Sequence, residues 1–197
     1  MRKVFISSIS MQKVNAFKYD SGVYPENNPT AFPITISLEN NCQPGDEVAF
    51  ITIVTHSEGN LAVENYHKFC EQAGSICREK GARAEFIELA VPARIEAASP
   101  RSLYKEIVAK LQDNDEIYAD ITYGFKYNPI VIFAALNNAY QVRENVDIKE
   151  ICYGNLYNGS AEIKPEYFDV TSLFYLNSLS GLMGVEGMMG DGGNVLL

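Results

Sequence analysis

The chain has 197 residues, of which 47% are hydrophobic and 21% charged, and its formal net charge is −9. This length and composition fit one globular domain, with or without a short appendage. The acidic balance argues against non-specific binding of nucleic acid, which requires a basic face to displace counterions. A small anionic ligand remains possible, because distant surface carboxylates are screened over about 8 Å at physiological salt.

The chain has four cysteines, none in a CxxC pair, and its only histidines are His56 and His67. This spacing gives no indication of a zinc site, so we expect no metal and four reduced thiols. The N-terminal apolar run is too short for a signal peptide, and no stretch reaches the roughly 18 apolar residues of a membrane span. We therefore expect a soluble, cytoplasmic protein that binds neither DNA nor membranes.

The first predicted strand covers residues 4–7, a short apolar run after two basic residues. Residues 9–41 show only a weak pattern. Within them, 24–29 have the composition of a loop, and 31–39 are ambiguous between helix and strand. A turn at 44–46 then leads into the regular part of the sequence.

A continuous apolar run at 47–54 predicts a strand buried on both faces, as in parallel sheets. Residues 60–80 carry apolar side chains at spacings of three and four, which predicts an amphipathic helix. Gly81 is a suitable C-terminal cap for this helix. A further strand is predicted at 84–91.

The second half of the chain continues this alternation. The pairs Ser-Pro at 99–100 and Asn-Pro at 128–129 each resemble a helix N-cap followed by proline at the first helical position. Strands are predicted at 115–121 and 148–153, and a last helix at 170–179. The helix that begins near Pro129 is almost wholly apolar, so we expect it to be buried on most sides.

Strands and helices alternate as in a doubly wound, mostly parallel, Rossmann-like α/β sheet with helices on both faces. In the commonest strand order, 3-2-1-4-5, the first predicted strand lies beside the fourth, so the loops at 7–10 and 122–128 are expected to be neighbours. We assign residues 1–180 to this domain. Glycine recurs every third residue from 181 to 190, which predicts a flexible linker or tail over 181–197. We expect it to lead to a further domain; a disordered natural end is the alternative.

Ligands of open α/β sheets bind outside the carboxyl ends of the strands, where the strand order reverses. The residues at these predicted ends are rich in hydroxyls, small side chains and aromatics. The candidate ligand-binding residues are Ser7, Ser8, Ile9, Ser10, Thr55, His56, Arg94, Thr122, Tyr123, Gly124, Phe125, Lys126 and Asn128.

Chemistry favours a nucleotide at these residues. The amides of a helix start and the cation of Lys126 attract phosphate, and Tyr123 and Phe125 are able to stack on a base. Asp120 is expected to support the loop by accepting hydrogen bonds from its amides. The alternative is an ordinary strand-to-helix turn in which Gly124 supplies a positive φ.

Several common active sites are not encoded. The chain has no GxGxxG motif, no P-loop, no GxSxG elbow, no HEPN-type ribonuclease signature and no zinc deaminase signature. We therefore expect no effector chemistry of these kinds within the 197 residues.

Residues 120–126, Asp-Ile-Thr-Tyr-Gly-Phe-Lys, resemble the DxTHG-type motif of CRISPR-associated Rossmann-fold (CARF) domains. The flanks are similar as well: an apolar strand precedes the motif, a buried helix follows it, and a strand ends in Tyr153-Gly154. Asp169-Val170-Thr171 resembles a step near the end of that domain. The resemblance covers about residues 103–179. Position 123 departs from the motif, because the family has histidine where this chain has Tyr123. A tyrosine is still able to hydrogen-bond and to stack, but it supplies no imidazole.

This resemblance implies a cyclic oligoadenylate sensor of type III CRISPR antiviral defence. Such domains form homodimers that bind a ring of four or six adenylates at their interface and allosterically control an attached ribonuclease, DNA nuclease or adenosine deaminase. Here the effector is expected on the C-terminal side, and no cofactor is expected besides the ligand.

Two alternatives would make the protein an enzyme. One is a metal-independent ring nuclease that aligns the ribose 2′-hydroxyl with its phosphate, for which Ser8, Ser10, Thr122 and Lys126 are the candidate groups. The other is a nucleoside-processing enzyme on the same fold, with Glu58 as its catalytic carboxylate. The sequence alone leaves these possibilities open.

Overall fold

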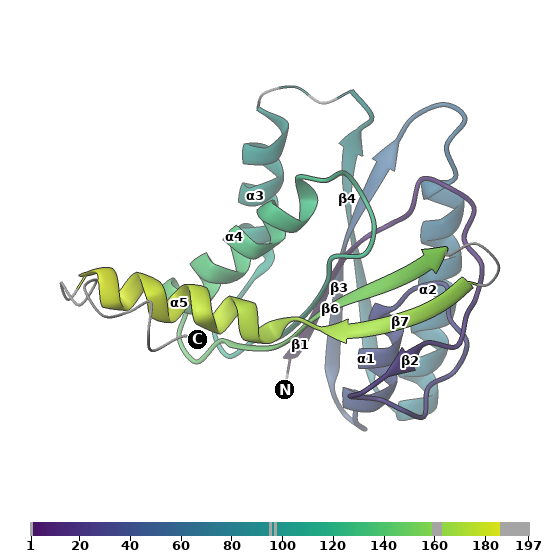
Figure 1. Ribbon diagram of the computed structural model, residues 1–197, viewed down its shortest axis with the longest axis horizontal. Coiled ribbons are helices and arrows are strands. Elements are labelled where there is room, and N and C mark those ends of the chain that lie inside the picture. Colours follow the sequence, from purple (N-terminus) through teal and green to yellow (C-terminus); the bar gives the residue numbers. More distant parts are fainter. Residues whose placement is uncertain (1, 95, 97, 159–162, 186–197) are drawn as a thin grey trace.

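The computed structural model describes residues 2–94, 96, 98–158 and 163–185 (Figure 1). Within these residues the chain forms a seven-stranded sheet in the order β2-β7-β6-β5-β1-β3-β4. The strands are β1 (Arg2–Ser8), β2 (Asp20–Ser21), β3 (Glu47–His56), β4 (Arg83–Pro92), β5 (Glu116–Asp120), β6 (Asp147–Asn158) and β7 (Ile163–Asp169). The helices are α1 (Ile34–Asn41), α2 (Ala62–Lys80), α3 (Ser99–Lys110), α4 (Asn128–Val142) and α5 (Thr171–Val185).

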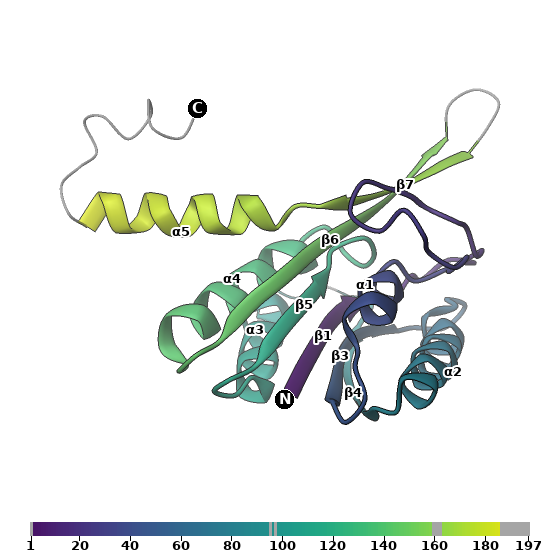
Figure 2. The ribbon, with the colours of Figure 1, turned by 90° about the horizontal axis from the view of Figure 1, so that it is seen from below.

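Five strands, β4, β3, β1, β5 and β6, are parallel and adjacent in that order. This confirms the predicted order 3-2-1-4-5. Strand β1 pairs with β3 on one side and β5 on the other, so the strand order reverses beside β1. The fold is the expected Rossmann-like α/β arrangement, and Figure 2 shows helices on both faces of the sheet.

The two faces of the sheet carry separate cores. Phe5 and Phe50 belong to the core beneath α1 and α2, whereas Ile6 and Ile51 belong to the core beneath α3 and α4. Neighbouring residues of β1 and β3 thus point to opposite faces, and both faces are covered by helices. This explains why the central strands appear in the sequence as continuous apolar runs.

The structure differs from the prediction at the edge of the sheet. Within the ambiguous stretch at 31–39, residues 34–39 belong to α1 and 31–33 precede it, and β2 and β7 were not predicted. β7 is antiparallel to β6, and the two-residue strand β2 pairs with β7. β7 contains Lys164, Pro165 and Glu166, so its composition is that of an edge strand and lacks the apolar run by which the inner strands are recognised.

Helix α5 also differs from its prediction. It ends at Val185, inside the segment 181–197 predicted as a linker, and residues 186–197 lie outside the described residues. Gly181 and Gly184 do not end the helix, because a glycine costs a helix only about 1 kcal/mol relative to alanine. In Figures 1 and 2, α5 projects away from the sheet. In the described part of the chain, none of the helices has the length and apolar character that crossing a membrane requires.

Candidate functional site

The loops that follow β1 and β5 are in direct contact. Ser7 and Asp120 are register partners at the ends of the two strands. Beyond them, Asn128 Nδ2 donates a hydrogen bond of 3.0 Å to Ser8 Oγ, and both residues are buried. The predicted proximity of the 7–10 and 122–128 loops is therefore confirmed, and a buried side-chain hydrogen bond joins them.

Gly124 permits this close approach. Its φ is +95°, and a Cβ at this position would lie 2.5 Å from Asn128 Nδ2 and 2.7 Å from Ser8 Cβ. Side chains other than hydrogen rarely adopt this backbone conformation, and neither neighbour leaves room for one. A positive φ alone would also occur in an ordinary turn. The close contact with Ser8, at the end of β1, is a second reason why only glycine fits at position 124.

Asp120 supports the loop, as predicted. Its Oδ1 accepts a hydrogen bond of 2.7 Å from the Thr122 amide, and its Oδ2 accepts one of 3.2 Å from the amide of Ile34, the first residue of α1. Burial raises the pKa of Asp120 to about 6, while the hydrogen bonds from Thr122 and Ile34 act in the opposite direction. One carboxylate therefore holds both the motif loop and the start of a helix.

Thr122 connects the motif loop to the next strand. Its Oγ1 accepts a hydrogen bond of 2.7 Å from the amide of Gly154 in β6. A side chain at Gly154 would collide with Pro33, which precedes α1. The Tyr153-Gly154 step that the sequence analysis singled out thus has a structural reason: the backbone of β6 passes between α1 and the motif loop.

Tyr123 is positioned by its hydroxyl. This group donates a hydrogen bond of 3.0 Å to the carbonyl oxygen of Ala31, in the segment before α1. Burial raises the pKa of Tyr123, so the hydroxyl stays protonated and keeps its role as donor. The hydroxyl of Tyr123 is thus engaged within the protein, and the ring is the part left for contact with a ligand.

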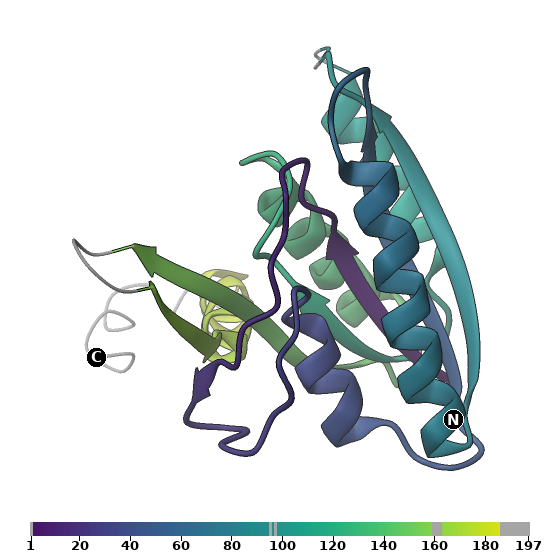
Figure 3. The same cartoon turned by 90° about the vertical axis from the view of Figure 1, so that its right-hand side faces the viewer.

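A cavity of about 240 Å³ opens beside Tyr123. It is lined by Ser10, Gln12, Lys13, Val14, Asn15, Phe17, Tyr123 and Leu156. Most of these residues belong to the segment between β1 and α1, drawn in purple in Figure 3. Lys13 is exposed, and the lining contains no carboxylate. Among the described residues, the only charged side chain in the lining is therefore the cation of Lys13.

Sequence reasoning found only two residues of this lining, Ser10 and Tyr123. The others, apart from Leu156 in β6, lie within 9–41, where no periodic pattern was visible. Asn65 Nδ2 holds this segment in place by donating hydrogen bonds to the carbonyl oxygens of Ser10 and Gln12. Such a contact between distant loops has no signal in a single sequence.

Asn128 has a second feature besides its bond to Ser8. Its Oδ1 is buried and has no hydrogen-bond partner among the described residues. The residue was predicted as the N-cap of the following helix, but α4 begins at Asn128 and the cap position is Tyr127. Most buried polar atoms are paired, so this acceptor is an exception within the part of the chain that the structure describes.

The remaining predicted site residues are less closely grouped. Ile9 is buried in the core beneath α1 and α2, and Thr55 is buried at the end of β3. His56 is exposed and pairs with Glu88, with 2.5 Å between His56 Nε2 and Glu88 Oε1. Arg94 is exposed beyond β4. Neither His56 nor Arg94 lines the cavity beside Tyr123.

The aromatic and basic positions after Gly124 lie directly before α4. The ring of Phe125 stacks on that of Tyr127, with centroids 5.7 Å apart, and Lys126 between them is exposed. Phe125 thus already has a stacking partner within the chain. Lys126 is available to a ligand or to solvent.

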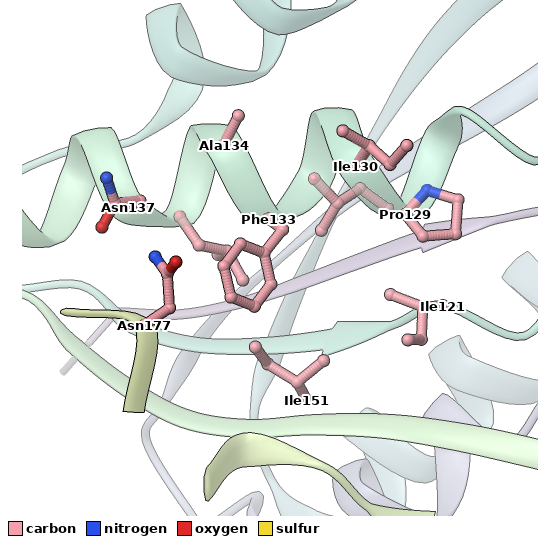
Figure 4. A pocket seen from close by; sticks show the side chains of 10 residues that line it. Ile121, Pro129, Ile130, Phe133, Ala134, Asn137, Ile151 and Asn177 are labelled. Atoms are coloured by element: carbon pink, nitrogen blue, oxygen red, sulfur yellow. The ribbon is translucent and has the colours of Figure 1, made fainter. Parts of the chain in front are cut away.

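A larger cavity of about 440 Å³ lies between α4 and α5 and has an apolar lining (Figure 4). None of the predicted site residues lines this cavity. The polar side chains in its lining are those of Asn137 and Asn177. We place the candidate ligand site at the smaller cavity, because the motif loop and a cation meet there.

No family model matches this chain, and no curated protein matches its sequence. A function for it has to be inferred from the motif at 120–126 and from the geometry at the ends of β1 and β5.

Proposed function

We propose that this domain binds a cyclic oligoadenylate, of four or six nucleotides, and acts as a sensor in type III CRISPR antiviral defence. The observation that carries the proposal is the buried hydrogen bond between Asn128 and Ser8, with Gly124 packed close to both residues. It joins the motif that resembles CARF domains to the end of β1, at the position where open α/β sheets bind ligands.

The chemistry of the adjoining cavity supports a nucleotide. Lys13 offers a cation for a phosphate, and the rings of Tyr123 and Phe17 offer apolar surface for a base. Backbone amides at the start of α4 add a partial positive charge.

A ring of four or six nucleotides is too large for the cavity of one copy. Sites for drug-sized ligands have volumes of roughly 300–1,000 Å³, and the cavity of about 240 Å³ in one copy is smaller than this range. A ring of four or six identical nucleotides has two-fold symmetry and fits the axis of a homodimer, with half of the ring on each copy. Binding would then bias the dimer geometry and control an effector attached after this domain.

We favour a sensor over a ring nuclease because two of its four candidate groups, Ser8 and Thr122, already connect parts of the protein to each other. Ser8 Oγ accepts from Asn128, and Thr122 Oγ1 accepts from the amide of Gly154. A nucleoside-processing enzyme is less well supported, since Glu58 is an exposed loop residue and does not line the cavity.

The test is recovery of the ligand after binding. Purified protein is mixed with cyclic tetra- or hexa-adenylate, the complex is isolated by size-exclusion chromatography, and the bound nucleotide is analysed by ion exchange. Co-elution of an intact ring supports the sensor. Recovery of linear products identifies a ring nuclease instead, and failure of either ring to co-elute contradicts the proposal.

A further inference from the structure

Away from the candidate site, three hydroxyl groups surround one buried carboxyl group. Glu150 of β6 and Tyr167 of β7 are each 3% exposed, and Ser37 of α1 is 0% exposed. The third hydroxyl is that of Tyr24, a partly buried residue of the segment before α1. These four residues, the Glu150 cluster, connect α1 to the neighbouring strands β6 and β7 (Figure 1).

Three members of the Glu150 cluster form a closed ring of hydrogen bonds. Ser37 Oγ lies 2.5 Å from Glu150 Oε2 and 2.7 Å from the Tyr167 hydroxyl oxygen. The Tyr167 hydroxyl in turn is hydrogen-bonded to Glu150 Oε1, which closes the ring. Tyr24 adds a fourth hydrogen bond from outside, with its hydroxyl oxygen 3.0 Å from Glu150 Oε2. That oxygen accepts a hydrogen bond from Asn41 Nδ2, so the Tyr24 proton is free to be donated to Glu150.

The three hydroxyls supply fewer protons than this arrangement needs. Each of the four hydrogen bonds requires one proton between its two oxygens, and three hydroxyls provide only three. If Glu150 were ionised, Ser37 and Tyr167 would both donate to it. Their oxygens would then face each other at 2.7 Å without a proton between them. A proton on Glu150 removes this deficit, because every bond of the ring then has one proton in whichever direction the ring runs.

The surroundings of Glu150 also favour its uncharged form. The titratable groups that face it are Tyr24, Tyr118, Asp120, Cys152, Tyr167 and Asp169. Lys3 of β1 reaches the end of α1 on the same side of the sheet, but it pairs with Asp46 and donates to the carbonyl oxygen of Asn41. No cation pairs with Glu150 in the described part of the chain. Burial raises the pKa of Glu150 above its ordinary value of 4.5, against the effect of the hydroxyl donors.

We propose that Glu150 carries a proton in the native fold and that this proton closes the hydrogen-bonded ring which holds α1 against β6 and β7. Loss of the proton breaks the bond between Ser37 and Tyr167, and therefore the direct link between α1 and β7. The ring forms a proton-dependent latch on α1, which loosens as pH rises. Because the amide of Ile34 at the start of α1 is bound by Asp120, this latch adjoins the motif loop. The inference does not rest on the proposed function, and its test uses no ligand.

The test is a pH titration of the full chain labelled with ¹³C at the carboxyl carbon of glutamate, followed by NMR. The signal that is missing from Glu150→Gln belongs to Glu150, and we expect its titration midpoint above 4.5. Tyr167→Phe takes two hydrogen bonds from the protonated ring but only one from the ionised form, and it removes the unprotonated oxygen pair. The midpoint should therefore fall in Tyr167→Phe. If Tyr167 only donated to a carboxylate, its loss would raise the midpoint instead.

Tyr175→Phe is the matched control, because the Tyr175 hydroxyl donates to the carbonyl oxygen of Ile148 and takes no part in the ring. It should leave the midpoint of Glu150 unchanged. A native midpoint at or below 4.5, or a midpoint that rises in Tyr167→Phe, would overturn the proposal.

Chemical denaturation at a series of pH values gives a second readout that does not need the tyrosine variants. The side-chain amide of glutamine donates on one side and accepts on the other, so Glu150→Gln imitates the protonated carboxyl group. A folded protein that holds an extra proton loses stability as pH rises above the ordinary pKa of that group. The native protein should thus lose stability relative to Glu150→Gln as pH rises above 4.5, and a gain relative to this variant would contradict the latch.

Discussion

The side-chain amide of Asn128 donates a hydrogen bond of 3.0 Å to the hydroxyl oxygen of Ser8, which precedes it by 120 residues. Ser8 ends β1, and Asn128 begins α4, so this bond connects the two loops at the point where the strand order of the sheet reverses. Gly124 is in contact with both residues. The arrangement of the candidate site depends on this three-residue contact, and the first two predictions concern it.

Replacing Gly124 by alanine should both destabilise the protein and weaken ligand binding. The new Cβ would be strained by the φ of +95° and would collide with Asn128 and Ser8. We expect a loss of about 2–4 kcal/mol in the free energy of unfolding. Gly59→Ala is the control, because Gly59 has a φ of +76° and nothing within 4 Å of its Cβ position; it should lose only about 1 kcal/mol. Both free energies of unfolding are measured by urea denaturation. Equal losses in Gly124→Ala and Gly59→Ala would show that the close approach of Gly124 to Ser8 and Asn128 does not contribute to stability.

Ser8→Ala should leave the side-chain amide of Asn128 without a partner. Asn128 Oδ1 is already unpartnered among the described residues, so the whole side-chain amide would then be buried without hydrogen bonds. We expect a loss of about 1–3 kcal/mol in unfolding free energy. Ser102→Ala on the exposed side of α3 should change it by less than about 0.5 kcal/mol. A double-mutant cycle with Asn128→Ala measures the coupling, and additive effects of the two substitutions would contradict this assignment.

Asp120 should make stability depend on pH in an identifiable direction. Its pKa is raised by burial from 3.8 to about 6. The folded protein therefore binds more protons than the unfolded chain between these values, and stability falls as pH rises through this window. Relative to the Asp120→Asn variant, the native protein should lose on the order of 3 kcal/mol of unfolding free energy between pH 4 and 7.

Chemical denaturation at a series of pH values measures this difference. Glu71→Gln, at an exposed position of α2, is the control and should run parallel to the native curve. Parallel native and Asp120→Asn curves would mean that Asp120 does not titrate in this range. Glu150, whose pKa burial also raises, is present in all three proteins, and its charge is one of the causes that raise the pKa of Asp120.

Lys13 should contribute to binding without contributing to stability. Its side chain is exposed and lines the cavity beside Tyr123. Lys13→Gln is expected to raise the ligand dissociation constant about 5- to 10-fold at low salt, and less at high salt. Lys18→Gln removes the same charge from an exposed residue of the same segment that does not line the cavity, and it should have a smaller effect. Equal effects in fluorescence titrations would indicate a general electrostatic attraction instead of a defined contact.

The sequence predicted the parallel part of the fold well. Apolar runs such as 47–54 are unambiguous when a strand is covered on both faces, and the strand order followed from the alternation of strands and helices. Hydrogen bonds from loop amides to Asp120 were also foreseen, because a carboxylate directly before a glycine-containing loop has few other partners nearby.

What the sequence did not reveal depends on contacts between distant residues. β7 is stabilised by pairing with β6 and not by an apolar pattern, and Pro165 within it argues locally against a strand. The Tyr123 hydroxyl donates a hydrogen bond to the carbonyl oxygen of Ala31, 92 residues away, and this bond has no signal in the sequence. Lys13 gave no signal, because a single lysine in an irregular segment acquires meaning only when the chain folds it against the motif loop.

The measurement that tests the central claim most directly is isothermal titration of the native chain with cyclic tetra- and hexa-adenylate, with the Gly124→Ala and Gly59→Ala variants alongside. The account predicts binding of one of the rings at micromolar concentration or tighter, at one ring per two chains, with affinity lost in Gly124→Ala and retained in Gly59→Ala. Absence of heat with both rings, or binding that Gly124→Ala leaves unchanged, would contradict a nucleotide site between the ends of β1 and β5.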